Sequence, residues 1–323
     1  METGTMPSSD PNYRRAVLLL LIFVSVLPLN GAIQIANFSA ATNDRFANDP
    51  QFIADSFDLS GVGRANTGRT GGYSGDDGGR WMTMLSPNVF IGTHHFFPRV
   101  GESVTFFPGN DPTQAGETRT VQSLSARLGT SDLRLGVLDN PLGSSFTFYD
   151  YARENIVSST DFSNSSLFGA NAYLFGRSPN SYPVSQDMAV GRNVLDVWVE
   201  SRTAAGATDV AIESRVDAEK GPSNNYVDFE AGLQPGDSGG PLFVANGMGG
   251  LTIVGINWYI LNDTNGNVVR NGHSYIGNHS AEIDAFIAAN PVPEPAVLGV
   301  VFGLAVFLLA LRRRATWTRR CDR

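Results

Sequence analysis

Residues 235–241 read Pro-Gly-Asp-Ser-Gly-Gly-Pro, and this run restricts the fold more than any other part of the chain. So many glycines and prolines exclude a helix interior and favour a tight turn between strands. A serine in such a turn can be exposed, with neighbouring backbone N–H groups directed at one point beside it. A serine nucleophile needs those donors and also a base. A Gly/Asp/Ser surface turn without chemistry is the alternative interpretation.

Most of the remaining chain predicts short β-strands. Apolar and polar residues alternate, or apolar residues run together, at 103–107, 145–149, 194–200 and 251–256. Turn-forming Gly, Asn, Asp and Ser residues separate these segments. The best helix candidate is 280–289, with Ser280 as its N-cap. The pattern therefore predicts an all-β body with one short C-terminal helix.

The N-terminus has the features of an export signal. Arg14 and Arg15 precede an apolar run at 16–27, and small residues follow up to Ala32. A basic start, a short apolar stretch and a small-residue cleavage site are typical of a secretory signal peptide. We expect residues 1–32 to be removed on export. An uncleaved N-terminal anchor is the alternative.

The C-terminus carries a second targeting pattern. Pro-Glu-Pro at 293–295 precedes an apolar run at 296–311, and an arginine-rich tail follows. The apolar run is a transmembrane candidate, with the arginines on the cytoplasmic side. Residues 291–323 resemble the PEP-CTERM sorting signal of Gram-negative bacteria. That resemblance implies an exosortase as partner, removal of the tail and delivery to the cell surface or extracellular matrix. A plain tail anchor is the alternative.

Charge and cysteine content exclude several functions. With 23 basic and 31 acidic residues the net charge is −8, which argues against nucleic acid as a partner. The single cysteine, Cys321, lies in the C-terminal tail, so the exported part can form no internal disulfide. His273 and His279 lack a metal-ligand pattern, and we expect neither a metal nor a cofactor.

A base for Ser238 can be sought at the end of an apolar strand. Residues 86–95 read Ser-Pro-Asn-Val-Phe-Ile-Gly-Thr-His-His, so His94 and His95 both lie at the end of an apolar segment. Asp132 opens another apolar strand, where its buried charge needs a partner. An imidazole N–H is such a partner, and the carboxylate would orient the ring. A plain turn cap is the alternative for Asp132.

These three segments resemble the His, Asp and Ser segments of the trypsin/chymotrypsin-like serine proteases. The Gly-Asp-Ser-Gly-Gly-Pro run matches throughout, and the order His95, Asp132, Ser238 is that of the family. The His segment departs from the family pattern, since Gly-Thr-His stands where Thr-Ala-Ala is usual. An ungapped match selects His95 rather than His94 as the base.

The resemblance implies an architecture for the protease domain, residues 33–290. It implies two six-stranded antiparallel β-barrels, at about 50–155 and 165–275, with the active site between them. The polar segment 154–166 would be the linker that crosses from one barrel to the other, and the short helix at 280–289 would close the domain.

The resemblance also implies roles for individual residues. Ser238 attacks a peptide carbonyl and forms an acyl-enzyme, His95 acts as general base and then acid, and Asp132 orients His95. The backbone N–H groups of Gly236 and Ser238 form the oxyanion hole. The expected partner is therefore a protein or peptide substrate.

Three further residues are weaker candidates for substrate binding. Gly232 matches the position that sets the charge preference of the primary pocket, so a preference for Arg or Lys is not supported. Asn257 and Trp258 resemble the strand that pairs with the substrate backbone.

The sequence leaves open whether the protease must be activated by a cleavage that creates a new N-terminus. In the family the aspartate before the nucleophile, here Asp237, accepts a newly formed N-terminal ammonium. Signal cleavage after Ala32 would expose Ile33, a suitable residue type. A long segment that includes the glycine-rich stretch 68–79 separates Ile33 from the His segment and argues against insertion of the N-terminus.

Two other functions compete with a protease. Gly-x-Ser-x-Gly at 236–240 also fits the nucleophile elbow of α/β-hydrolases, with Asp263 and either His273 or His279 completing the site. That elbow requires a strand, a turn and a helix. The other alternative is a non-catalytic module that uses the same fold for surface or matrix binding.

Overall fold

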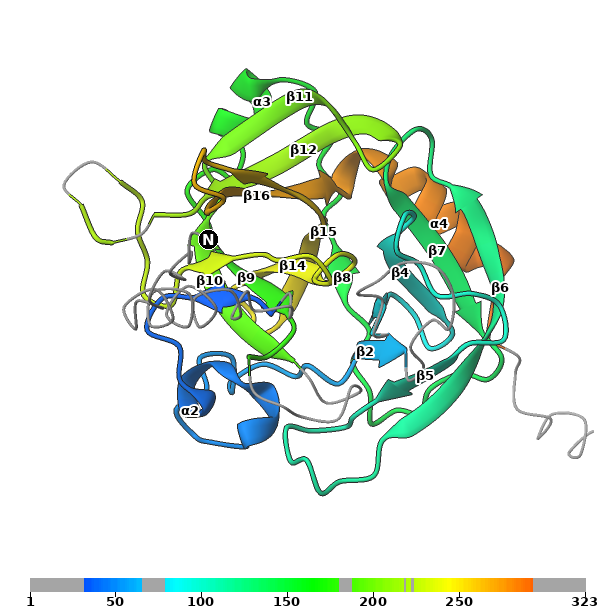
Figure 1. The fold of residues 1–323 in the computed structure, drawn as a ribbon. Coiled ribbons are helices and arrows are strands. Elements are labelled where there is room, and N and C mark those ends of the chain that lie inside the picture. Colours follow the sequence, from blue (N-terminus) through cyan, green and yellow to red (C-terminus); the bar gives the residue numbers. More distant parts are fainter. Residues whose placement is uncertain (1–31, 66–78, 180–187, 218, 222–223, 293–323) are drawn as a thin grey trace, which may run out of the picture.

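The computed structural model describes residues 32–65, 79–179, 188–217, 219–221 and 224–292. Within these residues strands dominate, and they form a closed six-stranded barrel beside an open sheet of eight strands (Figure 1). A further pair of two-residue strands joins the N-terminal segment to the second half of the chain. The prediction of an all-β body is confirmed for this part of the chain, but short helices occur in addition to the one predicted at the C-terminal end.

The closed barrel is built from the first half of the chain. Its strands are β2 (Val62–Ala65), β3 (Trp81–Met84), β4 (Val89–Thr93), β5 (Ser103–Phe106), β6 (Glu117–Arg127) and β7 (Leu133–Leu138). They pair in the order β2-β3-β4-β7-β6-β5, and β5 closes the ring on β2. Apolar residues such as Met82, Phe90 and Phe106 fill the interior and are fully buried.

The open sheet has the order β10-β9-β14-β15-β16-β12-β11, with β8 added in parallel to β15. Its strands are β8 (Asp150–Tyr151), β9 (Asn171–Gly176), β10 (Ala189–Val194), β11 (Val197–Ala204), β12 (Ala207–Arg215), β14 (Pro241–Ala245), β15 (Leu251–Asn262) and β16 (Val268–Tyr275). The separate pair is β1 (Gln34–Ile35) with β13 (Ala231–Gly232). The helices are α2 (Ala40–Asn43), η1 (Arg45–Ala47), α3 (Ser159–Asn164), η3 (Gly277–His279) and α4 (Ser280–Ala289).

The second half differs from the expected six-stranded barrel. Its sheet curves but stays open in the described part of the chain, because the edge strands β10 and β11 do not pair with each other. Beyond β10 the backbone contacts are isolated bridges, Asp44 with Ala189 and Arg192 with Glu230. The N-terminal strand β1 pairs with β13 and does not join this sheet.

Three local expectations also need correction. Residues 145–149 form a loop rather than a strand, because Phe146 and Tyr149 bury their rings from irregular backbone. The strand expected at 194–200 is interrupted between β10 and β11. The expected linker contains helix α3, which Ser158 caps by accepting from the Asp161 N–H.

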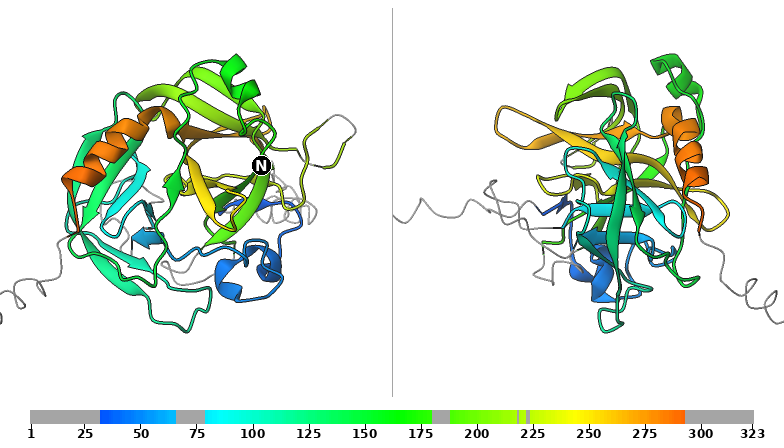
Figure 2. Two further views of the ribbon diagram at one scale, coloured as in Figure 1. Left: turned by 180° about the vertical axis from the view of Figure 1, so that it is seen from behind. Right: turned by 90° about the vertical axis from the view of Figure 1, so that its right-hand side faces the viewer.

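Helix α4 has the predicted bounds, but its N-cap is His279 and not Ser280. The helix follows the open sheet in sequence yet lies against the closed barrel (Figure 2). Ile283 packs into the core there, and Asn88 donates to the carbonyl of Asn290 at 3.1 Å. The helix thus ties the end of the domain back to its first half.

One apolar core joins the two halves. It includes Trp81 and Ile91 from the barrel together with Phe175, Phe243 and Ile256 from the open sheet. Because the two halves share this core, residues of one half are held firmly against those of the other.

Most of the expected signal peptide and the whole apolar run at 296–311 lie outside the described residues. Among the residues that are described, no helix is long and apolar enough to cross a membrane.

Candidate active site

The His and Asp segments meet because two barrel strands are neighbours. β4 ends at Thr93 and pairs in antiparallel fashion with β7, so Thr93 lies opposite Leu133. The pairing continues one step further, where the His94 N–H donates to the carbonyl of Asp132 at 2.6 Å. Antiparallel register therefore brings the end of one strand and the start of the other to the same point.

His95 and Asp132 form a hydrogen-bonded pair at this point. Asp132 Oδ2 accepts from His95 Nδ1, and Asp132 Oδ1 accepts from the His95 backbone N–H at 3.0 Å. Asp132 is fully buried, whereas the His95 side chain is 25% exposed. The carboxylate thereby fixes the ring and its tautomer, and it leaves Nε2 as the nitrogen available for proton transfer.

His94 lies in a different environment. Its Nδ1 is buried and has no hydrogen-bond partner among the described residues. Burial, followed by the charges of Arg127 and Arg134, lowers the pKa of His94 below its ordinary value. The nearby Asp132 charge opposes this shift only in part, so His94 is neutral at neutral pH, and its ring makes no hydrogen bond to a carboxylate among the described residues.

Glycine conformations shape the Ser238 loop. Gly236 and Gly239 have φ values of 103° and 91°, which a residue with a side chain rarely adopts. The Asp237 N–H donates to the Gln234 carbonyl and the Gly240 N–H donates to the Asp237 carbonyl, which closes the turn. Ser238 sits half-buried at its tip.

This loop presses against the strand that carries the histidines. A Cβ at Gly239 would lie only 3.3 Å from Thr93 Oγ1, so the residue after Ser238 touches the end of β4. Ser238 makes no hydrogen bond to His95 in the part of the chain that is described. The two side chains thus come from adjoining segments, and the bond between them is a proposal taken up below.

Two backbone donors beside Ser238 are unoccupied. Among the described residues, no acceptor takes the N–H of Gly236 or the N–H of Ser238. The carbonyl of Gly236, by contrast, accepts from the indole Nε1 of Trp81 at 3.3 Å. Unpaired N–H groups next to a half-buried serine can stabilise an oxyanion.

Asp237 is fully buried beneath the serine. Its two carboxylate oxygens accept from the backbone N–H groups of Arg177 and Gln234, at 2.7 and 2.8 Å. Burial raises the pKa of Asp237 to about 8. A carboxyl group therefore supports the loop, and burial disfavours the charged form of that group.

Ile33 lies next to this carboxyl group. A Cβ at Gly176 would be 2.6 Å from Ile33 Cβ and 2.8 Å from Asp237 Cγ, so the glycine contacts both. Ile33 is 1% exposed and its N–H donates to the Arg177 carbonyl at 3.0 Å. The sequence argued against insertion of the N-terminus, yet pairing of β1 with β13 brings Ile33 beside Asp237. An ion pair between a free Ile33 ammonium and Asp237 stays a prediction.

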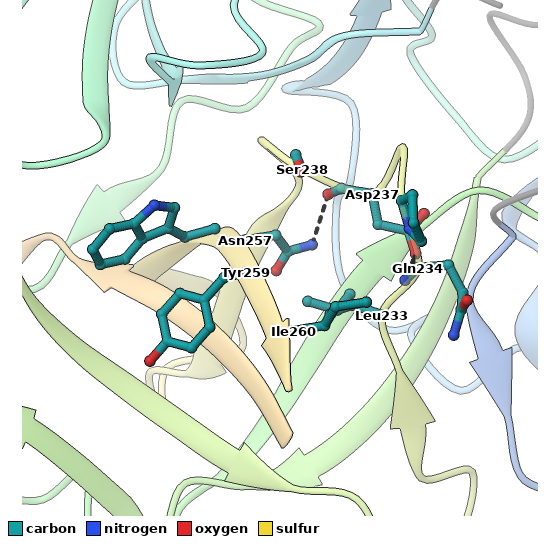
Figure 3. Close-up of a pocket in the computed structure, with 9 residues that line it drawn as sticks. Leu233, Gln234, Asp237, Ser238, Asn257, Tyr259 and Ile260 are labelled. Carbon is teal, nitrogen blue, oxygen red and sulfur yellow. Dashed lines mark hydrogen bonds between the residues drawn. The ribbon is translucent and has the colours of Figure 1, made fainter. Parts of the chain in front are cut away.

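A small cavity of about 130 Å³ opens beside Ser238 (Figure 3). Leu233 and Ile260 supply apolar surface to it. The one ionisable acid in its wall, Asp237, is engaged with backbone N–H groups. The cavity therefore suits a small apolar side chain.

The weaker candidates for substrate binding are placed as follows. Asn257 and Trp258 line the cavity, but both side chains are buried and engaged. Asn257 donates to the carbonyls of Phe175 and Asp237, and the Trp258 indole donates to the Ala204 carbonyl. Gly232 lies in β13, outside the residues that line the cavity.

The residues that an α/β-hydrolase site would need do not come together. The segment after Ser238 is strand β14, where the elbow requires a helix. Asp263 bonds to Asn267 in its own turn, and His279 pairs with Asp209 at 2.8 Å. His273 is fully buried, and burial lowers its pKa to about 3.

The described residues contain no cluster of three or more His, Cys, Asp or Glu side chains that could hold a metal ion.

Two features of the site were not predicted from the sequence: the contact of Trp81 with the Ser238 loop and the position of Ile33 beside Asp237. Both act through contacts between segments far apart in the chain, and no local pattern signals such contacts.

No protein-family model and no curated protein matches the chain. Many solved structures match the chain, and two of them are described here. An inactivated protease paralogue of the scabies mite is 14% identical with a TM-score of 0.46, over 70% of this chain and 94% of its own. A mutant of human heparin binding protein is 17% identical with a TM-score of 0.47, over 74% and 95%.

Proposed function

We propose that this chain is a serine endopeptidase that cleaves peptide bonds through His95, Asp132 and Ser238. The observation that carries the proposal is that the Ser238 loop abuts the strand end from which His95 projects, while His95 is bonded to the buried Asp132. Nucleophile, base and orienting acid thus come from adjoining segments. The unoccupied N–H groups of Gly236 and Ser238 support an oxyanion hole there.

The mechanism follows from these positions. His95 Nε2 removes the proton from Ser238 Oγ as the oxygen attacks the substrate carbonyl, and the negative charge moves to the carbonyl oxygen. The N–H groups of Gly236 and Ser238 stabilise that charge. His95 then donates its proton to the leaving amine, and water hydrolyses the acyl-enzyme by the reverse sequence.

The cavity beside Ser238 supports a substrate with a small apolar residue on the acyl side of the cut. Peptide substrates that differ only at this residue test the preference. We expect kcat/KM to be highest for Ala or Val, and lower for Phe, Arg and Asp, because a buried charge without a partner is strongly disfavoured. Equal rates for Val and Arg would contradict this assignment.

A second candidate function is a non-catalytic surface or matrix-binding module. The missing hydrogen bond between Ser238 and His95 in the described residues favours it. A fluorophosphonate probe separates the two functions, since it labels only an activated serine. A folded chain that begins at Ile33 and still resists the probe would be a binding module.

Export and surface sorting complete the proposal. Residues 1–32 would direct the chain across the inner membrane, and residues 291–323 would be processed by an exosortase. The arrangement of basic, apolar and Pro-Glu-Pro residues supports both steps. Fractionation of the host should find the mature chain outside the cytoplasm, and replacing Pro-Glu-Pro by three alanines should retain it in the membrane.

A further inference from the structure

Trp81 is a contact between the closed barrel and the Ser238 loop. It is the first residue of β3 and is fully buried. Its indole Nε1 donates to the carbonyl of Gly236, and a Cβ at Gly239 would lie 3.5 Å from Trp81 Cβ. One side chain of the first half therefore touches the loop of the second half on both sides of the serine.

The indole ring is itself held in place. Trp81 pairs with Arg64 across β2 and β3, and the Arg64 guanidinium carbon lies 4.8 Å from the ring centre. Arg64 is fully buried. A desolvated guanidinium over an indole face is among the stronger cation–π contacts. This contact restrains the ring and therefore the direction of the indole N–H.

The loop needs such a fixed contact at Gly236. Glycine lets the peptide units on either side of it rotate at little steric cost, so contacts with neighbouring groups select the φ of 103°. The peptide unit between Gly236 and Asp237 is held at both ends. Its N–H donates to the Gln234 carbonyl at 3.0 Å, and its carbonyl accepts from Trp81. The two unoccupied donors, at Gly236 and Ser238, flank this unit.

We propose that Trp81 is a positioning residue for the oxyanion site, acting through the Gly236 carbonyl. This inference rests on the proposed function, because it assigns a role to the same loop. Without the indole N–H, the Gly236–Asp237 peptide unit loses one of its two restraints, and the flanking Gly236 and Ser238 N–H groups are held less firmly toward the oxyanion. Losing one oxyanion donor lowers turnover by roughly 100- to 1,000-fold, which is the upper bound for the effect of Trp81.

The test is Trp81→Phe in the purified protein, since this change keeps an aromatic ring and removes the N–H. We expect the rate constant for fluorophosphonate labelling and kcat for a peptide ester to fall about 10- to 100-fold. KM should change little, because the oxyanion exists only in the transition state. Affinity for a peptide boronic acid, which mimics that state, should fall together with kcat.

Trp198→Phe is the matched control. Trp198 is also buried and stacks on Phe162, with ring centres 5.6 Å apart, but its indole N–H has no partner among the described residues. This variant should lose packing energy and keep the labelling rate. Equal losses of labelling in the two variants would overturn the inference, because both losses would then reflect stability alone.

A readout without catalysis separates this inference from the proposed function. The amide signal of Gly236 in a ¹H–¹⁵N NMR spectrum should shift or split in Trp81→Phe and stay unchanged in Trp198→Phe. If the Gly236 signal responds but the wild type resists the probe, the proposed function fails and the anchoring role of Trp81 stands. If the signal does not respond to Trp81→Phe, the inference is overturned whatever the activity.

Discussion

At the scale of residues, two adjacent histidines have opposite properties. The His95 ring is bonded to the buried Asp132 and is partly open to solvent, whereas His94 buries an unpartnered nitrogen and has a lowered pKa. The sequence indicated both histidines as candidate bases, but it gave no physical reason to prefer one of them. The choice depends on the antiparallel register of β4 and β7, which only the fold defines.

The histidines can be separated by substitution. His95→Ala should lower kcat/KM for a peptide substrate by about 1,000-fold or more, because Ser238 loses its base. His94→Ala should keep activity within about tenfold, since it removes no proton acceptor from the site. Circular dichroism confirms that both variants fold. The reverse order of effects would show that His94 is the base.

At the scale of elements, the small strand pair β1–β13 has the largest consequence. It holds Ile33 beside Asp237, whose buried carboxyl has a raised pKa. The sequence predicted the barrel strands β4, β5 and β7 from their apolar patterns, but not β2, β3 or β6. It could not predict a two-residue strand that pairs across the length of the domain, nor the loop at 145–149, where tertiary burial of aromatic rings overrides an alternating pattern.

This placement leads to a pH prediction. The folded pKa of Asp237, about 8, lies above its ordinary value of 3.8, so the folded chain binds this proton more tightly than the unfolded chain. Its contribution to stability is present below the ordinary pKa and is lost as pH rises through about 8. A free ammonium at Ile33 would offset the loss by pairing with the carboxylate.

The measurement is the unfolding midpoint as a function of pH for two forms of the chain. One form begins at Ile33, and the other keeps Gly31 and Ala32. We expect the midpoint of the longer form to fall more between about pH 5 and pH 8. Asp237→Asn should remove the difference between the two forms. Parallel curves for the unsubstituted forms would show that no such ion pair exists.

At the scale of the whole molecule, a shared apolar core joins the two halves. The only cysteine of the chain lies in the C-terminal tail, so this core has to act without a disulfide. The alternating pattern predicted an all-β body, and the family resemblance of the three motifs implied a site between two halves. That the second half is an open sheet depends on which edge strands find partners, and hydrophobic pattern does not encode this.

A reducing agent therefore should not change stability. We expect the unfolding midpoint of the exported chain to be the same with and without dithiothreitol, within the error of the measurement. Calorimetry in both conditions tests this. A lower midpoint under reduction would mean that Cys321 is retained and forms a bond between chains.

The most direct test of the central claim is labelling of the purified chain with a fluorophosphonate probe, beside Ser238→Ala and His95→Ala. Wild-type protein should be labelled at one site, and neither variant should be labelled, because the probe requires both the hydroxyl and its base. Absence of label on a folded wild type whose N-terminus is Ile33 would contradict the assignment of this chain as a serine protease.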